Sequence, residues 1–155
     1  MEKLDRYDRA LLITLQKNGR ATNVELSANA NLSAPQCYRR VQRLEEEGII
    51  RGYTAQLDPT YIGFAIVAFV CLSIDRGEFK NVRKLEGEIR AFPEILECHT
   101  ITGDFDYLLK VVAPDLKELS NFLTDHLMQV PGVSSVRSMV CLDEVKKASP
   151  FPIVK

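Results

Sequence analysis

Arginine and glutamine side chains gather on one side of the segment 34–47. At 100° per residue, Gln36, Arg39 and Arg43 project from the same side of a helix, with Arg40 beside them. Guanidinium groups bind phosphates and the edge of guanine, and a glutamine amide pairs with adenine. The opposite side carries residues suited to a core, namely Ala34, Cys37, Val41 and Leu44. A helix of this kind suits the major groove of DNA.

The residues before this helix position it by local signals. Thr22-x-x-Glu25 and Ser33-x-x-Gln36 both have the form of a capping box, in which a hydroxyl and a side chain three residues later satisfy the first backbone N–H groups of a helix. Between them Asn31 tolerates a left-handed backbone, as a tight turn requires. The stretch 22–48 therefore predicts a helix-turn-helix whose second helix reads DNA.

Seven residues are predicted to contact DNA because the second helix or the segment after it exposes them: Ser33, Gln36, Tyr38, Arg39, Arg40, Arg43 and Arg51. Each has a simpler reading, since charged helix faces are usually only solvated. Arg40 could pair with an acid of its own domain, and Gln36 could serve only the cap. Tyr38 could pack, Ser33 is first a cap, and Arg51 is a candidate phosphate contact.

The flanking sequence completes a DNA-binding domain at residues 1–58. The pattern predicts a first helix over Leu4–Lys17, which Asp5 would cap and Asp8 would stabilise through the helix dipole. Strand-like residues around Gly52, over 49–57, predict a short hairpin that would form a wing. These elements together predict a winged helix-turn-helix.

Residues 64–155 predict a second domain, after a linker at 59–63. Its apolar patterns indicate strands at 64–74, 95–102, 107–113 and 133–142, with helices at 78–92 and from Asp115 onward. The order β-α-β-β-α-β favours a ferredoxin-like sandwich with both helices on one face of an antiparallel sheet. The fold class is α+β, and self-association is expected to cover the other face.

Composition excludes several other classes of protein. The chain has 155 residues, 46% apolar and 26% charged, and a net charge of −1, so DNA binding is argued from arginine placement alone. No secretory signal is recognisable, and the apolar run 62–72 is too short to cross a bilayer. The four cysteines lie far apart without a C-x-x-C pair, which disfavours disulfides and zinc and favours a reducing cytoplasm.

Catalysis is not expected from this sequence. It has no phosphate-binding or dinucleotide-binding glycine motif and no triad with motif context, so no catalytic residue, metal site or cofactor is predicted. Asp104 and Asp106 resemble a catalytic carboxylate pair, but acidic residues are common in hairpin turns.

The chain resembles the leucine-responsive regulator / asparagine regulator (Lrp/AsnC) family of prokaryotic transcription factors over nearly its entire length. The matching motifs of the first half are Leu4-Asp5-x-x-Asp8, Gly19-Arg20, Glu25-Leu26, Leu32-Ser33, Arg40-Val41, Leu44-Glu45, Gly48-Ile49-Ile50, Gly52-Tyr53, Asp58-Pro59 and Gly63. Those of the second half are Thr102-Gly103-Asp104-Phe105-Asp106-Tyr107-Leu108-Leu109, Pro131-Gly132-Val133 and Leu142-x-Glu144-Val145-Lys146.

The resemblance implies dimers that assemble into octamers or similar rings, and a small amino acid bound between dimers. By position in the family, the implied effector-binding residues are Thr100, Thr102, Gly103, Asp104, Asp106, Met128, Ser134 and Ser135. Met128 favours an apolar effector such as leucine or methionine. Two other functions stay open: a winged-helix adaptor for proteins, without specific DNA or ligand binding, and an enzyme of amino-acid metabolism.

Overall fold

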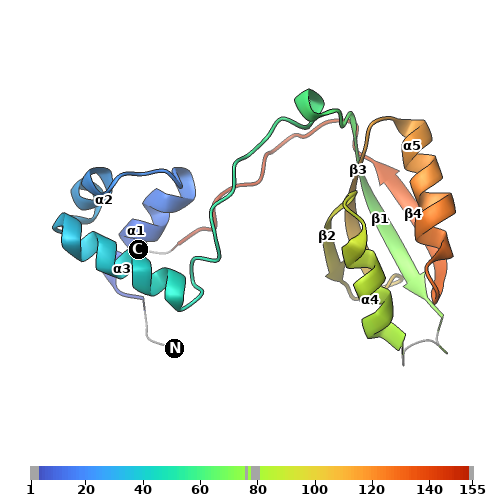
Figure 1. Cartoon of the computed structure of the whole chain (residues 1–155), viewed down its shortest axis with the longest axis horizontal. Helices are drawn as coiled ribbons and strands as arrows, with labels where there is room; N and C mark the ends of the chain where they lie inside the picture. Colours follow the sequence, from blue (N-terminus) through green and yellow to red (C-terminus); the bar gives the residue numbers. More distant parts are fainter. Residues whose placement is uncertain (1–3, 76, 78–80, 154–155) are drawn as a thin grey trace. The chain divides into compact units, whose positions relative to one another are not determined.

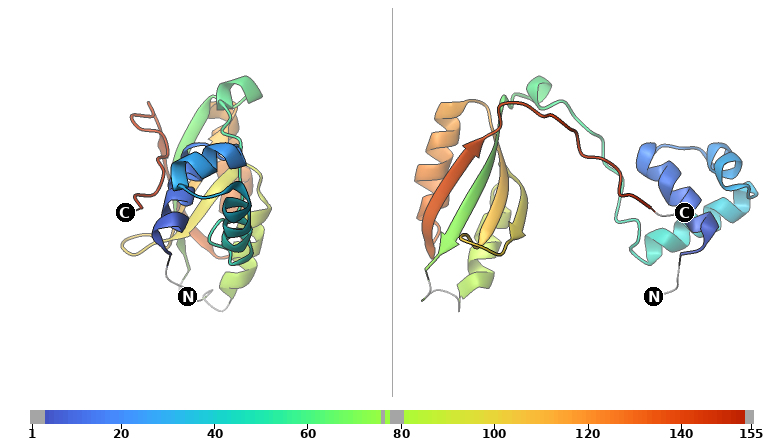
Figure 2. Two further views of the ribbon diagram at one scale, coloured as in Figure 1. Left: turned by 90° about the vertical axis from the view of Figure 1, so that its left-hand side faces the viewer. Right: turned by 180° about the vertical axis from the view of Figure 1, so that it is seen from behind.

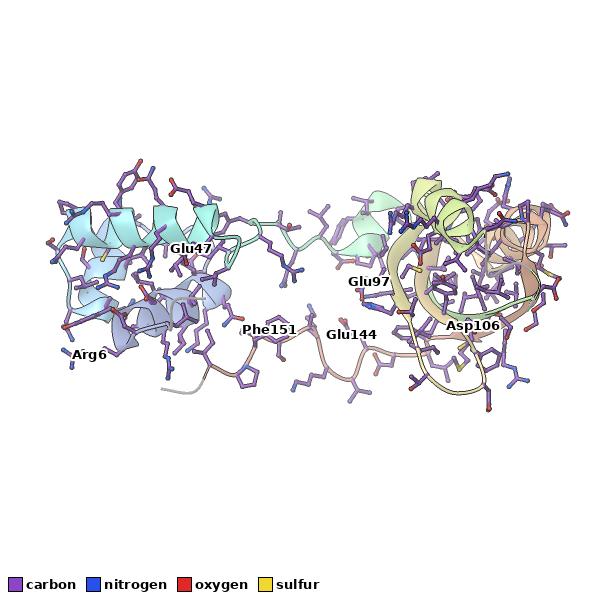
Figure 3. The ribbon with its side chains drawn as sticks, turned by 90° about the horizontal axis from the view of Figure 1, so that it is seen from below. Arg6, Glu47, Glu97, Asp106, Glu144 and Phe151 are labelled. Carbon is purple, nitrogen blue, oxygen red and sulfur yellow. The ribbon has the colours of Figure 1, made fainter. Side chains whose placement is uncertain are left out.

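The structure, a computed structural model, describes residues 4–75, 77 and 81–153, and the chain divides into two compact units. The helical unit comprises residues 1–56 and 146–155, and the sheet unit comprises residues 57–145. The C-terminal arm, residues 146–153, thus lies with the helical unit, whereas the sequence analysis assigns it to the second domain. The Phe151 backbone explains this placement: its N–H donates to Gln16 Oε1 at 2.7 Å, and its carbonyl accepts from Gln16 Nε2 at 3.2 Å. Phe151 is labelled on this arm in Figure 3.

Three helices form the helical unit: α1 (Arg6–Lys17), α2 (Asn23–Ala30) and α3 (Ala34–Glu46) (Figure 1). Asp5 caps α1 by accepting the backbone N–H of Tyr7 and of Asp8, both at 2.8 Å, which confirms the predicted cap. The Thr22 capping box is also present. Asn31 takes the left-handed conformation, with φ 52° and ψ 47°, and so forms the predicted turn between α2 and α3.

The core of the helical unit joins all three helices. Its buried members come from the apolar side of each helix: Leu11, Leu15, Leu26, Ala30 and Cys37. Leu44, near the end of α3, is also fully buried. Because Cys37 and Leu44 bury one side of α3, only the opposite side is available to a ligand.

The prediction of a hairpin of two strands over 49–57 is wrong, because residues 51–58 lie in no helix or strand. The side chain of Tyr53, and not strand pairing, attaches this segment to the helices. The hydroxyl of Tyr53 donates to Glu45 Oε1 on α3 at 2.8 Å. Its ring lies so near Gly19 that a Cβ at residue 19 would stand 3.1 Å from Tyr53 Cδ1. Residues 51–58 are therefore an irregular segment that Tyr53 attaches to the helices.

The sheet unit contains the predicted β-α-β-β-α-β order. Its elements are β1 (Ile66–Ile74), α4 (Val82–Ala91), β2 (Ile95–Thr100), β3 (Tyr107–Ala113), α5 (Leu116–Asn121) and β4 (Val133–Val140), preceded by the short 3₁₀ helix η1 (Pro59–Ile62). The strands are antiparallel in the order β2-β3-β1-β4, which confirms the ferredoxin-like prediction. The predicted start of α4, residues 78–80, lies outside the described residues.

Both helices of this unit cover one face of the sheet (Figure 2). The core between them is built from alternate strand residues, including Val70, Leu72, Leu109 and Val111, and from Ile89 of α4. On the other face apolar side chains remain at the surface: Phe69 is 38% exposed, and Met139, its partner in the β1–β4 register, is 49% exposed. This arrangement confirms the prediction that the helices lie on a single face.

The last helix differs from the predicted continuous helix with Leu116, Leu119, Leu123 and Leu127 on its buried side. After α5 the backbone forms a π-helical turn, η3 (Phe122–His126), followed by a 3₁₀ turn, η4 (Leu127–Gln129). A π-turn contains one residue more than an α-turn, so the side chains after it change phase. Leu127, just after the π-turn, is fully buried, and Leu119 and Phe122 are nearly so. Leu116, the first residue of α5 and well before the π-turn, is 60% exposed, contrary to the prediction.

Tyr107 gives the sheet unit an expected sensitivity to alkaline pH. Burial, together with a 3.1 Å hydrogen bond to Glu86 Oε1, raises the pKa of Tyr107 to about 12. Between an unfolded value of about 10 and this folded value, only the unfolded tyrosine ionises, so rising pH favours unfolding.

We therefore expect the free energy of unfolding to fall by about 1–2 kcal/mol over this pH window, and Tyr107→Phe to flatten that fall. Urea unfolding followed by circular dichroism at several pH values measures it. Tyr61→Phe, at a residue 91% exposed, serves as the control. An equal fall in the Tyr107→Phe variant would contradict the assignment.

Candidate DNA-binding and ligand-binding sites

Helix α3 presents a polar surface on the side away from its core. Tyr38 is 52% exposed, and Gln36 and Arg39 are also exposed. Among the residues that the structure describes, no side chain forms a hydrogen bond or ion pair with Arg39. Its guanidinium therefore keeps all its donors available for an external partner.

The other two arginines of α3 are held within the domain. Arg40 Nη1 lies 2.8 Å from Asp5 Oδ2 and 2.8 Å from Asp8 Oδ1. Arg43 Nη2 lies 2.8 Å from Asp8 Oδ2, and its Nε lies 3.7 Å from Glu47 at the end of α3. The pairing of Arg43 with Asp8 was not predicted, and the alternative in which Arg40 pairs with an acid of its own domain is confirmed.

These contacts change how the charged groups titrate. Burial opposes the charged form of Asp5, but hydrogen bonds from the Asp8 backbone N–H and from Arg40 outweigh it and lower the pKa of Asp5. Burial likewise acts against the charge on Arg40, yet its bonds to Asp8 and Asp5 hold the pKa of Arg40 above the ordinary value. Both partners therefore remain charged at neutral pH.

Ser33 and Gln36 serve the start of α3. The backbone N–H of Ser33 donates to Gln36 Oε1 at 3.0 Å, and the Ser33 hydroxyl donates to the same oxygen at 2.9 Å. The carbonyl oxygen of Gln36 is thus engaged, which leaves its NH₂ group as the part that could read a base. Arg51 is exposed in the extended segment after α3.

The predicted effector residues fall at one end of the sheet. The loop 101–106 joins β2 to β3 there, and the register pairs Ser73 with Ser135 and Ile74 with Val133, so the start of β4 lies beside the end of β1. Seven of the predicted residues are exposed at this end or on the turn before β4: Thr100, Thr102, Gly103, Asp104, Met128, Ser134 and Ser135. Gly103 has φ 122°, a conformation that favours glycine.

Asp106 is occupied within the fold. Its carboxylate Oδ2 accepts the Ile74 N–H at 2.8 Å, and its own N–H donates to the Leu72 carbonyl at 2.8 Å. The loop is thereby fixed to the end of β1. Of the two loop carboxylates, Asp104 is the one exposed to a ligand.

The residue that sequence reasoning missed is Asp8, which was assigned only to the helix dipole. The side chain of Asp8 is 2% exposed, and it joins α1 to two arginines of α3. The sequence signals at Asp8 were its spacing from Asp5, which places both acids at the start of the helix, and its place in the motif Leu4-Asp5-x-x-Asp8. In the described part of the chain, no cluster of candidate metal ligands occurs and no helix is long and apolar enough to span a membrane.

Comparison with known proteins covers both units. A family model for winged helix-turn-helix DNA-binding domains matches residues 4–51, and one for the Lrp/AsnC ligand binding domain matches residues 67–151. The leucine-responsive regulatory protein of Escherichia coli (strain K12) is 42% identical over 146 residues, which cover 94% of this chain and 89% of that protein.

Solved structures agree with the sequence relatives. A transcriptional regulator from Neisseria meningitidis, in complex with L-Met, is similar with a TM-score of 0.91 and 38% identity, over 97% of each chain. An AsnC family transcriptional regulator from Agrobacterium tumefaciens has a TM-score of 0.89 and 30% identity, over 96% of this chain and 97% of that one. This chain therefore belongs to the Lrp/AsnC family of transcriptional regulators, with a helix-turn-helix DNA-binding domain and a ligand-binding domain.

Proposed function

We propose that α3 reads operator DNA directly, with Arg39 as its principal contact. The observation that carries this proposal is that Arg39 is exposed and pairs with no side chain among residues 4–75, 77 and 81–153, whereas Arg40 and Arg43 are paired with acids. Gln36 and Tyr38 are exposed on the same helix, and in this proposal the exposed Ser33 and Arg51 would contact phosphates. We divide the chain functionally at residues 59–63, between DNA binding and ligand binding.

The ligand in this proposal is a small amino acid bound at the end of the sheet that holds the loop 101–106. Backbone N–H groups of such a loop suit a carboxylate, and Asp104 suits an ammonium group. Met128, 52% exposed in the 3₁₀ turn η4, would add an apolar wall and favours leucine or methionine. The L-Met complex of the Neisseria relative is consistent with this class of ligand.

Self-association through the open face of the sheet completes the proposal. Phe69 and Met139 leave apolar surface there, beside the ion pair between Glu97 and Lys110, whose atoms lie 3.4 Å apart. A second copy would cover this face in a symmetric dimer, and dimers would assemble further, to an octamer or a similar ring. The protein would act as a regulator without enzymatic activity, in the cytoplasm with its DNA.

A titration with DNA tests the proposal. The protein is added to its own upstream DNA at several salt concentrations, with and without a mixture of amino acids. We expect sequence-specific binding that weakens as salt rises and that the amino acids alter, because phosphate contacts release counterions and the ligand is linked to assembly. Lack of binding at low salt would reject the DNA role. Binding that the amino acids leave unchanged would reject the effector role.

A further inference from the structure

Asp8 is a buried acid at the junction of α1 and α3. Its side chain is 2% exposed, and each of its two oxygens accepts from a different arginine at 2.8 Å. Oδ2 also accepts the backbone N–H of Asp5 at 3.2 Å. A buried carboxylate with this many charged partners holds their side chains in fixed positions, because any departure would leave its charge unpaired.

The ion pairs of Arg40 and Arg43 partly neutralise the positive charge of the surface that would face DNA. Arg40 and Arg43 are matched by Asp5, Asp8 and Glu47. Residues 1–58 as a whole contain nine basic and eight acidic residues, so this domain carries little net charge. Non-specific binding to DNA is almost entirely electrostatic, and it grows with the number of cations that reach phosphates.

The paired arginines nevertheless remain at the edge of the reading surface. Asp5, Gln36, Arg39, Arg40 and Arg43 line an open recess of about 370 Å³. The Arg40 and Arg43 side chains are 28% and 36% exposed, so loss of their acidic partner would leave them within reach of a nearby phosphate. The acids thus hold the charged ends of two partly exposed side chains.

We propose that Asp8 is a positioning residue that restrains Arg40 and Arg43, and thereby raises the discrimination of this protein between operator DNA and other DNA. The inference rests on the proposed function of α3, and it adds that the ion pairs of Asp8 limit non-specific binding to DNA. Specificity is a ratio of two affinities, and an acid that lowers the weaker affinity raises that ratio. Helix α3 would then distinguish operator DNA from other DNA by the contacts of Arg39 more than by non-specific electrostatic attraction.

The test compares the wild-type protein with Asp8→Asn on two duplexes, its own upstream DNA and a random-sequence duplex, by fluorescence anisotropy over a range of salt. We expect Asp8→Asn to bind the random duplex about 3- to 10-fold more tightly at low salt, with a log–log salt slope steeper by about 1 for one added phosphate contact. The ratio of the two affinities should fall accordingly. A purely structural role would weaken both affinities and would not steepen the slope.

Two further variants keep the result decisive if Asp8→Asn fails to fold. Asp5→Asn removes one acidic partner of Arg40 while asparagine retains the N-cap, so it should change slope and ratio in the same direction by a smaller amount. Asp115→Asn changes net charge equally at the N-cap of α5 in the other unit, and should leave both unchanged.

The outcomes separate the two proposals. If the wild-type protein binds neither duplex at low salt, the proposed DNA role fails. If it binds and the folded Asp8 or Asp5 variants keep its slope and ratio, the inference about Asp8 alone is overturned. An effect of Asp115→Asn as large as theirs would overturn it too, because net charge would then explain the change.

Discussion

Replacing Arg39 by alanine should weaken binding of the upstream DNA by about 10- to 100-fold, with a shallower salt dependence. Loss of one arginine contact to a base or phosphate costs about 1–3 kcal/mol, and each 1.4 kcal/mol is about a tenfold change. The stability of the domain should not change, because Arg39 is exposed and contacts no acid in the described structure. Anisotropy titrations at several salt concentrations measure the affinity and the slope.

Two variants control this result. Arg39→Lys retains the charge but loses the planar pair of donors, so it should recover binding to random DNA more fully than binding to the upstream DNA. Arg83→Ala removes an exposed arginine from α4 of the other unit and should have no effect. Binding by Arg39→Ala at the wild-type affinity would instead support the adaptor alternative, in which α3 contacts a protein.

Replacing Asp106 by alanine should destabilise the sheet unit by about 1–3 kcal/mol. The Asp106 carboxylate accepts the Ile74 N–H at 2.8 Å in a partly buried position, and its removal leaves that N–H group without its partner. The loop 101–106 also loses its attachment to the end of β1. Urea unfolding followed by circular dichroism measures the loss, and wild-type stability in this variant would show that the bond contributes nothing.

Asp104→Ala is the matched comparison, two residues away in the same loop. Asp104 is exposed, so its replacement should leave stability unchanged. Binding of leucine or methionine by calorimetry should weaken by about tenfold, since the ammonium group would lose its charged partner. If Asp104→Ala binds the amino acid as the wild-type protein does, Asp104 is no ligand residue.

The parts of this molecule that the sequence predicted well are those that local rules decide. The caps at Asp5 and Thr22 and the left-handed turn at Asn31 depend on residues at most three positions apart, and all occur as expected. The strand order followed from two βαβ patterns, because few topologies accommodate them. The exposed position of Arg39 followed from helical periodicity alone.

The errors arose where contacts join distant parts of the chain. The pattern predicts the polar side of α3 for Arg43, but it does not reveal the ion pair with Asp8, which lies 35 residues earlier in the sequence. The segment 49–57 has strand-like composition, yet Tyr53 binds Glu45 and, within the described residues, the segment forms no strand. The π-turn that begins at Phe122 depends on tertiary packing, and an apolar pattern with the ordinary helical period does not predict it.

The pairing of Gln16 with Phe151 makes the helical unit discontinuous in sequence, with the sheet unit inserted between its two segments. The ribosome therefore releases α1, α2 and α3 well before the arm that completes them, and the whole sheet unit emerges in between. The three helices can pack early around their own core, but the Gln16 amide gains its Phe151 partner only after the whole sheet unit has been synthesised. A tag inserted directly after the arm would accordingly be attached to the helical unit and not to the sheet unit.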